Sequence, residues 1–241
     1  MASLADPYLK TARAKEHLDD LRERLRVFRE SQPIRITRED DVEKQRHIVR
    51  LNVQDIPEKF ALIVGDFLFC LRSSLDQLVW ALAHITTPYP RGTQFPVFEA
   101  PNPDLFAQYT TGVPAEALKI IESLQPYLGQ NTAAAKSHLL WRLNMLCNID
   151  KHRRIPTDKN ITDMRFSDFP KEFIPLIEYD NDTGVISVPI GLKSKMGDPT
   201  AFLNVIFGDS HEGIECDFAG MEAIYNFVAN SVIPRFTRFF K

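Results

Sequence analysis

The sequence lacks the features that mark several common classes of protein. Its 241 residues carry a net charge of −3, so the chain has no overall excess of positive charge for binding polyanions. Long apolar runs are also missing, because residues 60–71, the longest, are interrupted by Gly65 and Asp66 and are too few to cross a bilayer. Residues 1–10 have neither the basic nor the apolar region of a signal peptide. We therefore expect no membrane partner.

Cysteine is scarce, and its spacing indicates no disulfide framework. The three cysteines, Cys70, Cys147 and Cys216, are far apart and form no CxxC pair. An odd number of separated cysteines favours a reducing compartment, so we expect the protein to be cytoplasmic.

Familiar catalytic and metal-binding motifs are absent too. The chain has no glycine-rich phosphate loop, no GxSxG nucleophile elbow and no HExxH pair. Its histidines never fall at metal-ligand spacing beside cysteines or carboxylates, so we expect no bound metal and no cofactor. The six histidines are His17, His47, His84, His138, His152 and His211.

What the sequence does contain is typical of a globular protein with long helices. Apolar residues make up 44% and charged residues 25%, which argues against long disordered regions. Three segments have the apolar periodicity of amphipathic helices, residues 7–31, 57–85 and 133–154. The sequence therefore predicts a core built from these helices. In the first of them, charges of both signs are interleaved, which indicates a solvated face.

Strand signals fall in two regions of the chain. Residues 33–37 and 46–53 alternate in the manner of strands and predict a hairpin. After Pro156, which ends the third helix, short segments rich in branched and aromatic residues predict an antiparallel meander. Asp217 is placed to cap a last helix. The expected meander strands are residues 161–166, 173–179, 184–192 and 201–207.

The expected fold class is α+β, with a helical core of long amphipathic helices and a small antiparallel β-sheet inserted before the C-terminal helix. We divide the chain accordingly. Residues 1–156 form the helical core with the short hairpin at about 33–53, residues 157–216 form the β-rich insertion, and residues 217–241 form a C-terminal helix that packs back on the core.

The end of the third long helix carries the strongest signal for a functional site. Asn144, Asn148, Lys151 and His152 follow one another along one side of this helix, away from its leucine face. A core helix tolerates such a polar stripe only where water, a partner or a ligand meets it. Because a histidine with polar neighbours can exchange protons near neutral pH, His152 is a candidate catalytic residue.

A second charged motif lies in residues 71–78 of the preceding long helix. Arg72 and Asp76 are one turn apart and predict an intrahelical ion pair, which contributes about 0.3–0.5 kcal/mol on a helix flank. Asp150 falls on the apolar side of its own helix, where an unpaired carboxylate is costly. We therefore expect Asp150 to pair with Arg72 across the two central helices.

A structural interpretation of the late cluster is open as well. Lys151, His152, Arg153 and Arg154 occupy the last helical turn. Positive charge there complements the exposed carbonyls and the helix macrodipole without any ligand.

These motifs resemble those of a widespread group of uncharacterised bacterial proteins. The shared pattern includes LRSSLDQLVW at residues 71–80, Phe95-Pro96, LQPY at residues 124–127 and NIDKHR at residues 148–153, and it covers most of the chain. More distantly, the helical part is similar to HEPN domains. Those are helical bundles of bacterial toxins and antiviral systems, and many are metal-independent ribonucleases that dimerise to form their site.

The HEPN resemblance implies a ribonuclease site. The signature histidine would be His152 and the signature polar residue Asn148, but Cys147 stands where the signature has arginine. Arg72 or Arg153 would then supply the positive charge. His152 would move a proton at the ribose 2′-hydroxyl or the leaving oxygen, and the arginine would stabilise the charge that develops on the phosphate. The implied partners are RNA or a nucleotide, and a second copy of the chain.

Four further residues would support that site: Asp76, Asp150, Lys151 and Asn144. Asp150 would hold Arg72 or Lys151 in place. The competing hypothesis is a non-catalytic protein-interaction or scaffold module, in which the same charged motifs form a buried polar network that fixes how the two central helices pack.

Overall fold

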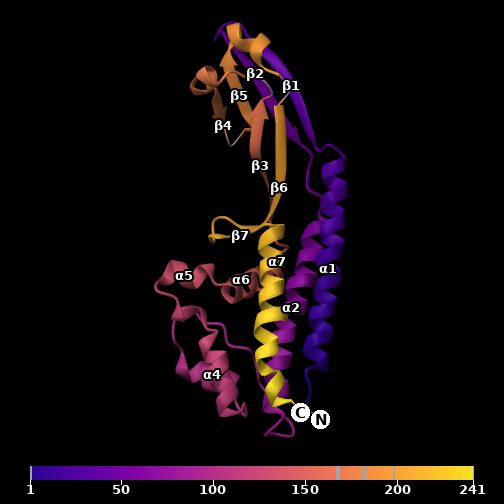
Figure 1. Cartoon of the computed structure of the whole chain (residues 1–241), viewed down its shortest axis with the longest axis vertical. Helices are drawn as coiled ribbons and strands as arrows, with labels where there is room; N and C mark the ends of the chain where they lie inside the picture. The colour runs from indigo at the N-terminus through magenta and orange to yellow at the C-terminus, as the bar shows by residue number, and fades with distance from the viewer. Residues whose placement is uncertain (1, 167–168, 181–182, 198, 241) are drawn as a thin grey trace. The chain divides into compact units, whose positions relative to one another are not determined.

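The computed structural model describes residues 2–166, 169–180, 183–197 and 199–240. It has the expected α+β class, with long helices and small antiparallel sheets (Figure 1). The chain divides into two compact units. The helical unit comprises residues 1–23, 58–157 and 207–241, and the sheet unit comprises residues 24–57 and 158–206.

Four helices form the core of the helical unit: α1 (Ala5–Glu30), α2 (Lys59–Ala83), α6 (Leu139–His152) and α7 (Phe218–Asn226). Residues 24–30, the last part of α1, belong to the sheet unit. The long helices agree with the predicted periodicity, and α2 is the most deeply buried because apolar residues occupy most of its circumference. Large apolar side chains of α2 that are at most 1% exposed include Phe67, Leu68, Leu71, Leu75, Leu78, Val79 and Leu82.

The predicted helix over residues 133–154 is wrong in one respect, because it is broken. α5 (Thr132–Ser137) ends at His138, whose backbone is extended, and α6 begins at the next residue. Nδ1 of His138 accepts a hydrogen bond from the backbone N–H of Leu140 at 3.2 Å. The side chain therefore caps α6 and satisfies one of the donors that every helix leaves free at its start.

Two short helices and one turn connect α2 to α5. They are α3 (Pro103–Tyr109), α4 (Ala115–Ser123) and the 3-10 turn η1 (Pro126–Leu128).

The C-terminal helix begins as expected and then changes its winding. The side chain of Asp217 accepts a hydrogen bond from the N–H of Gly220 at 2.8 Å, which confirms the predicted cap. α7 continues as the π-helical η4 (Phe227–Val232) and the 3-10 helix η5 (Ile233–Phe239). Its core side chains are Met221, Ile224, Val228, Val232 and Phe236.

The main sheet has the strand order β1-β2-β5-β4 and is antiparallel throughout. The strands are β1 (Ile34–Asp41), β2 (Arg46–Val53), β5 (Val185–Pro189) and β4 (Glu178–Asp180). The sequence-based division grouped the hairpin β1–β2 with the helices, whereas β2 pairs with β5 of the later segment. A two-stranded hairpin is marginal alone, and this pairing gives it an apolar core. That core contains Val49, Leu51, Ile186, Val188 and Met196.

A second sheet has the order β3-β6-β7, with β3 (Thr157–Phe166), β6 (Pro199–Asp209) and β7 (Ile214–Cys216). The predicted local meander is therefore wrong, because β5 lies beside β2 of the hairpin.

Two of the predicted strands are also too long. In the predicted strand 173–179, Lys171–Leu176 forms the 3-10 helix η2 instead, because Pro175 has no N–H for a strand ladder. In the predicted strand 184–192, β5 ends at Pro189, and the 3-10 helix η3 (Ile190–Lys195) follows.

Candidate functional site

The predicted site lies where α2 and α6 pack against each other. Arg72 is 4% exposed, and its Nη2 donates to the backbone oxygen of Phe95 at 2.7 Å. The same nitrogen lies 3.0 Å from Oδ1 of Asp76, which confirms the predicted intrahelical pair. Oδ1 of Asp76 also accepts the N–H of Phe95 at 2.9 Å. The pair therefore holds both backbone polar groups of one loop residue.

The same loop is held from a second side. Nε2 of Gln125 donates to the backbone oxygen of Pro96 at 2.8 Å, and its Oε1 accepts the N–H of Phe98 at 3.2 Å. Gln125 is 2% exposed. Residues 95–98 are thus fixed to the helices through buried side chains, which accounts structurally for both the Phe95-Pro96 and the LQPY motifs.

Burial is the largest electrostatic influence on the ion pair. It lowers the pKa of Arg72 and raises the pKa of Asp76, because each charged form loses water. The opposite charge of each partner, and for Asp76 the N–H of Phe95, act against these shifts. The positive charge of Lys151 also lowers the pKa of Asp76, and Arg72 lowers that of Cys147. The charged motifs of α2 and α6 therefore lie within electrostatic reach of each other.

Asp150 does not take the position that the sequence predicts. Its carboxylate lies against Gly65 of α2, and among the described residues no ion pair joins it to Arg72. Gly65 is two helical turns from Arg72, about 10 Å along the axis, so the register of the two helices separates them. Burial first, and the negative charge of Asp66 second, raise the pKa of Asp150.

The basic residues at the end of α6 make separate contacts. His152 is exposed, and within the described part of the chain no hydrogen bond joins it to Arg72, Asn144 or Asn148, which are buried or half-buried. Arg153 is bound by two acids of the β6–β7 turn, with 2.6 Å from Nη2 to Oδ2 of Asp209 and 2.7 Å to Oε1 of Glu212.

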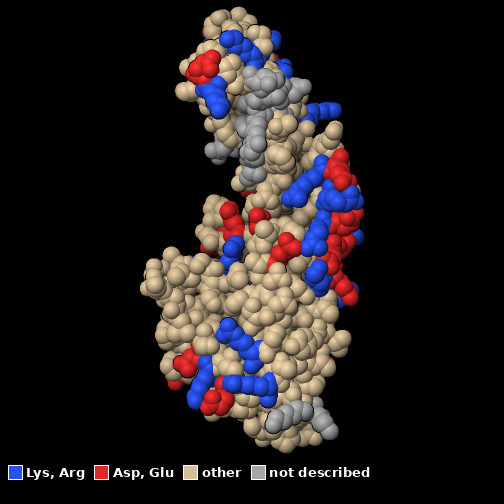
Figure 2. Space-filling view, viewed as in Figure 1, with Lys and Arg blue, Asp and Glu red and all other residues tan. Residues whose placement is uncertain are grey.

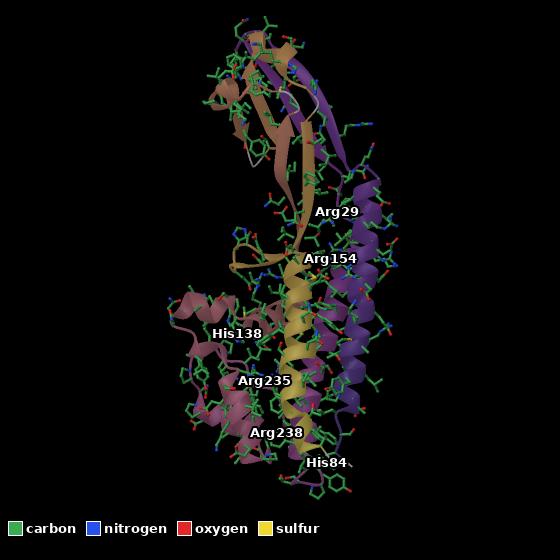
Figure 3. The ribbon with its side chains drawn as sticks, viewed as in Figure 1. Arg29, His84, His138, Arg154, Arg235 and Arg238 are labelled. Atoms are coloured by element: carbon green, nitrogen blue, oxygen red, sulfur yellow. The ribbon has the colours of Figure 1, made fainter. Side chains whose placement is uncertain are left out.

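Nη1 of Arg154 (labelled in Figure 3) lies 2.8 Å from Oε2 of Glu58, the residue before α2. Electrostatic influence thus links Arg72 and Asp76 with Cys147 and Lys151, whereas Arg153 pairs with acids of the β6–β7 turn.

Two buried polar atoms of α2 have no hydrogen-bond partner among the described residues. Among the described residues, Nη1 of Arg72 and Oε1 of Gln77 are the buried side-chain nitrogen and oxygen atoms without a hydrogen bond. One is a donor and the other an acceptor, five residues apart on α2. Buried polar groups of this kind are satisfied in most proteins by ordered water or by a ligand.

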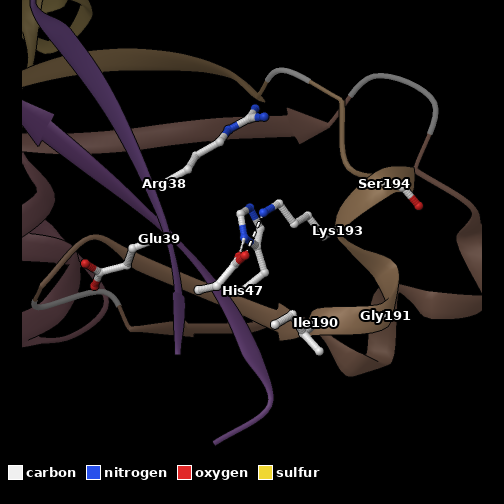
Figure 4. Close-up of a pocket in the computed structure, with 8 residues that line it drawn as sticks. Arg38, Glu39, His47, Ile190, Gly191, Lys193 and Ser194 are labelled. Atoms are coloured by element: carbon white, nitrogen blue, oxygen red, sulfur yellow. Dashed lines mark hydrogen bonds and ion pairs between the residues drawn. The ribbon is translucent and has the colours of Figure 1, made fainter. Parts of the chain in front are cut away.

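A separate polar hollow lies in the sheet unit, and the sequence analysis did not find it. It has a volume of about 640 Å³ and is built around the buried His47, which lies opposite Asp40 in the β1–β2 register (Figure 4). Counting residues outward from the hairpin turn would have paired these two side chains. The hollow is lined by Arg38, Glu39, Asp40, His47, Ile190, Gly191, Lys193 and Ser194.

The charged surface of α1 has the mixed character that its sequence indicates. Exposed ion pairs such as Arg13–Glu16 and Lys15–Asp19 join neighbouring turns. Figure 2 shows blue and red side chains interleaved along this helix. Mixed ion pairs of this kind are typical of a solvated face, and they do not form a basic patch that would bind nucleic acid.

Within the described residues, no group of three or more histidines, cysteines and acids lies close enough to hold a metal ion. None of the described helices combines the length and apolar character that crossing a membrane requires. No family model, curated protein or solved structure matches the chain.

Proposed function

We propose that the chain is a non-catalytic protein-interaction module that pairs with a second copy of itself through one face of α2. The observation that carries the non-catalytic role is that both motif arginines are bound by groups of the same chain. Arg72 is buried against Asp76 and the Phe95 backbone, and Arg153 is bound by Asp209 and Glu212. Charges that stabilise a transition state need to face the substrate, whereas these face other parts of the chain.

The proposed contact surface is the exposed stripe of α2. Leu62, Phe69 and Trp80 are 60%, 54% and 43% exposed. Their spacings of seven and eleven residues place them on the same side of the helix, over five turns and about 27 Å. Large apolar side chains gathered on the exposed side of a mostly buried helix, here with the exposed Asp66 among them, are typical of an interaction surface.

A second copy fits this stripe because the stripe is self-complementary. In an antiparallel pairing of two α2 helices centred on Leu71, Leu62 faces Trp80 of the partner copy, and Phe69 faces Ser73 of the partner copy. Each large ring then meets a smaller side chain, as a two-fold interface requires. Lys10, whose Nζ lies 5.3 Å from the centre of the Phe69 ring, supplies a charged border.

Analytical ultracentrifugation of the full chain tests the pairing. We expect a reversible dimer, and Phe69→Glu should make it monomeric because the apolar ring is lost and a carboxylate is costly to bury at the contact. Val42→Glu is the matched control, since Val42 is 67% exposed in the hairpin turn and lies outside the stripe. A monomeric parent chain, or equal loss of dimer in both variants, contradicts the proposal.

The ribonuclease hypothesis is the competing reading of the same motifs. Its support is that Lys151 and His152 are both exposed at the end of α6. It requires His152 and Asn148, with Arg72 or Arg153, to act on RNA without metal. Single-stranded RNA that stays intact with the chain and a chelator supports the non-catalytic module. Cleavage that His152→Ala abolishes would overturn it. A place in a toxin or defence system and a cytoplasmic location stay predictions.

A further inference from the structure

We propose that the hollow around His47 binds the anionic head of a small polar molecule, a phosphate or a carboxylate. This site is formed within the sheet unit and does not depend on pairing through α2. Its volume of about 640 Å³ lies in the range of small-molecule sites. Six of its eight lining residues are polar or charged, so the occupant is hydrophilic.

The carboxylate of Asp40 lies at the base of the site, between the side chains of His47 and Lys193. Oδ1 of Asp40 lies 2.6 Å from Nδ1 of His47, and Oδ2 accepts a hydrogen bond from Nζ of Lys193 at 2.6 Å. His47 is 2% exposed, so the imidazole is held firmly between the strands. Lys193 is tied to β1 through Asp40, and its ammonium is thereby positioned at the hollow.

A comparison of donors and acceptors identifies the class of ligand. Both oxygens of Asp40 are occupied, and Glu39 accepts from Nη2 of Arg50 at 2.5 Å. Lys193 has three N–H donors, of which Asp40 takes one. Arg38 donates to the backbone oxygen of Gly197 at 3.2 Å and adds a second full positive charge to the lining.

Both oxygens of Asp40 and one oxygen of Glu39 therefore already have a partner, while Lys193 keeps two N–H donors beside the one that Asp40 accepts. A group that only accepts hydrogen bonds and carries negative charge matches this arrangement. Figure 4 shows the two cationic side chains coming from different elements, Arg38 from β1 and Lys193 from η3. In this arrangement Lys193 contacts the anion, and Asp40 and His47 act as positioning residues.

Titration of the full chain with inorganic phosphate, and separately with acetate, tests the site. Binding is followed by NMR through the ring signals of His47, with chloride of equal ionic strength as the reference. We expect saturable binding of at least one probe, and the probe that binds decides between the phosphate and carboxylate sources. Lys193→Met should weaken it about tenfold or more, because a charge-assisted hydrogen bond is lost.

Lys195→Met is the matched control. Like Lys193→Met, this substitution removes one positive charge. Lys195 is two residues from Lys193, but its Nζ lies over the Phe173 ring and outside the hollow. Absence of saturable binding of both probes, or equal weakening by Lys193→Met and Lys195→Met, overturns the proposal.

Discussion

The carboxylate of Asp150 on α6 lies against the backbone of Gly65 on α2. A methyl group at Gly65 would come within 2.7 Å of Oδ2 of Asp150, so this contact depends on the absence of a side chain. The neighbouring Asp66 adds negative charge beside a partly buried carboxylate, and both effects raise the pKa of Asp150. An acid therefore sits at the helix interface in the place where the sequence predicts an ion pair.

Asp150→Asn should stabilise the protein at neutral pH. A raised pKa means that the folded state binds more protons than the unfolded state, so stability falls as pH rises from below 3.8 through the folded pKa. The asparagine variant lacks this penalty. We expect a Tm above that of the parent chain, by at most a few degrees, at neutral pH and equal Tm values below pH 3.8. Calorimetry across this range measures the difference. Asp55→Asn, at a fully exposed carboxylate, should show no such trend.

Arg72→Met should destabilise the fold by about 3–5 kcal/mol, because it leaves the buried Asp76 without its cation. The loop at Phe95 also loses a hydrogen bond. Urea unfolding measures the change in free energy. Arg13→Met removes an exposed pair with Glu16 on α1 and should have a much smaller effect. Equal effects of the two substitutions would contradict a structural role for the buried pair.

His138 should make stability depend on pH in the opposite direction. Burial lowers its pKa below the usual 6.5, so the unfolded state binds more protons and stability is lost as pH falls below that value. His138→Asn keeps a side-chain cap for α6 and removes the titrating group. We expect Tm to fall less steeply between neutral and mildly acidic pH in this variant. His211→Asn, at an exposed position, serves as the control.

The three cysteines should be unreactive in the folded protein. Burial raises the pKa of Cys216 to about 11 and also raises the pKa values of Cys70 and Cys147. Because the thiolate is the reactive form, a thiol reagent at mildly alkaline pH should modify the native chain slowly and all three sites after denaturation. An Ala12→Cys variant, with its thiol on the exposed side of α1, provides the fast reference. Rapid native reaction of Cys216 would refute the expectation.

Local patterns were enough to predict the helices, because each carries its apolar side in its own sequence. The buried stripe of α1, with Leu18, Leu21 and Leu25, and the cap at Asp217 both follow from residues a few positions apart. The break at His138 was missed because its side chain acts as a cap, a role that histidine seldom takes. The segment ending at Leu176 was misassigned because its apolar residues suggested a strand, although Pro175 has no N–H.

The candidate site was predicted only where its residues share one helix. Arg72 and Asp76 are a turn apart, so their pairing is local. The partner of Asp150 depends on the axial register of α2 against α6, which no short-range pattern encodes. Likewise, Arg153 meets Asp209 from a turn 56 residues away.

The sequence by itself determined the fold class, the long helices and the hairpin, since periodicity and turn residues act over a few neighbouring positions. Tertiary structure alone decided that the hairpin pairs with β5 and that Lys193 reaches Asp40. These contacts join residues more than a hundred positions apart. Their formation depends on which apolar faces must be buried together, and that is a property of the whole chain.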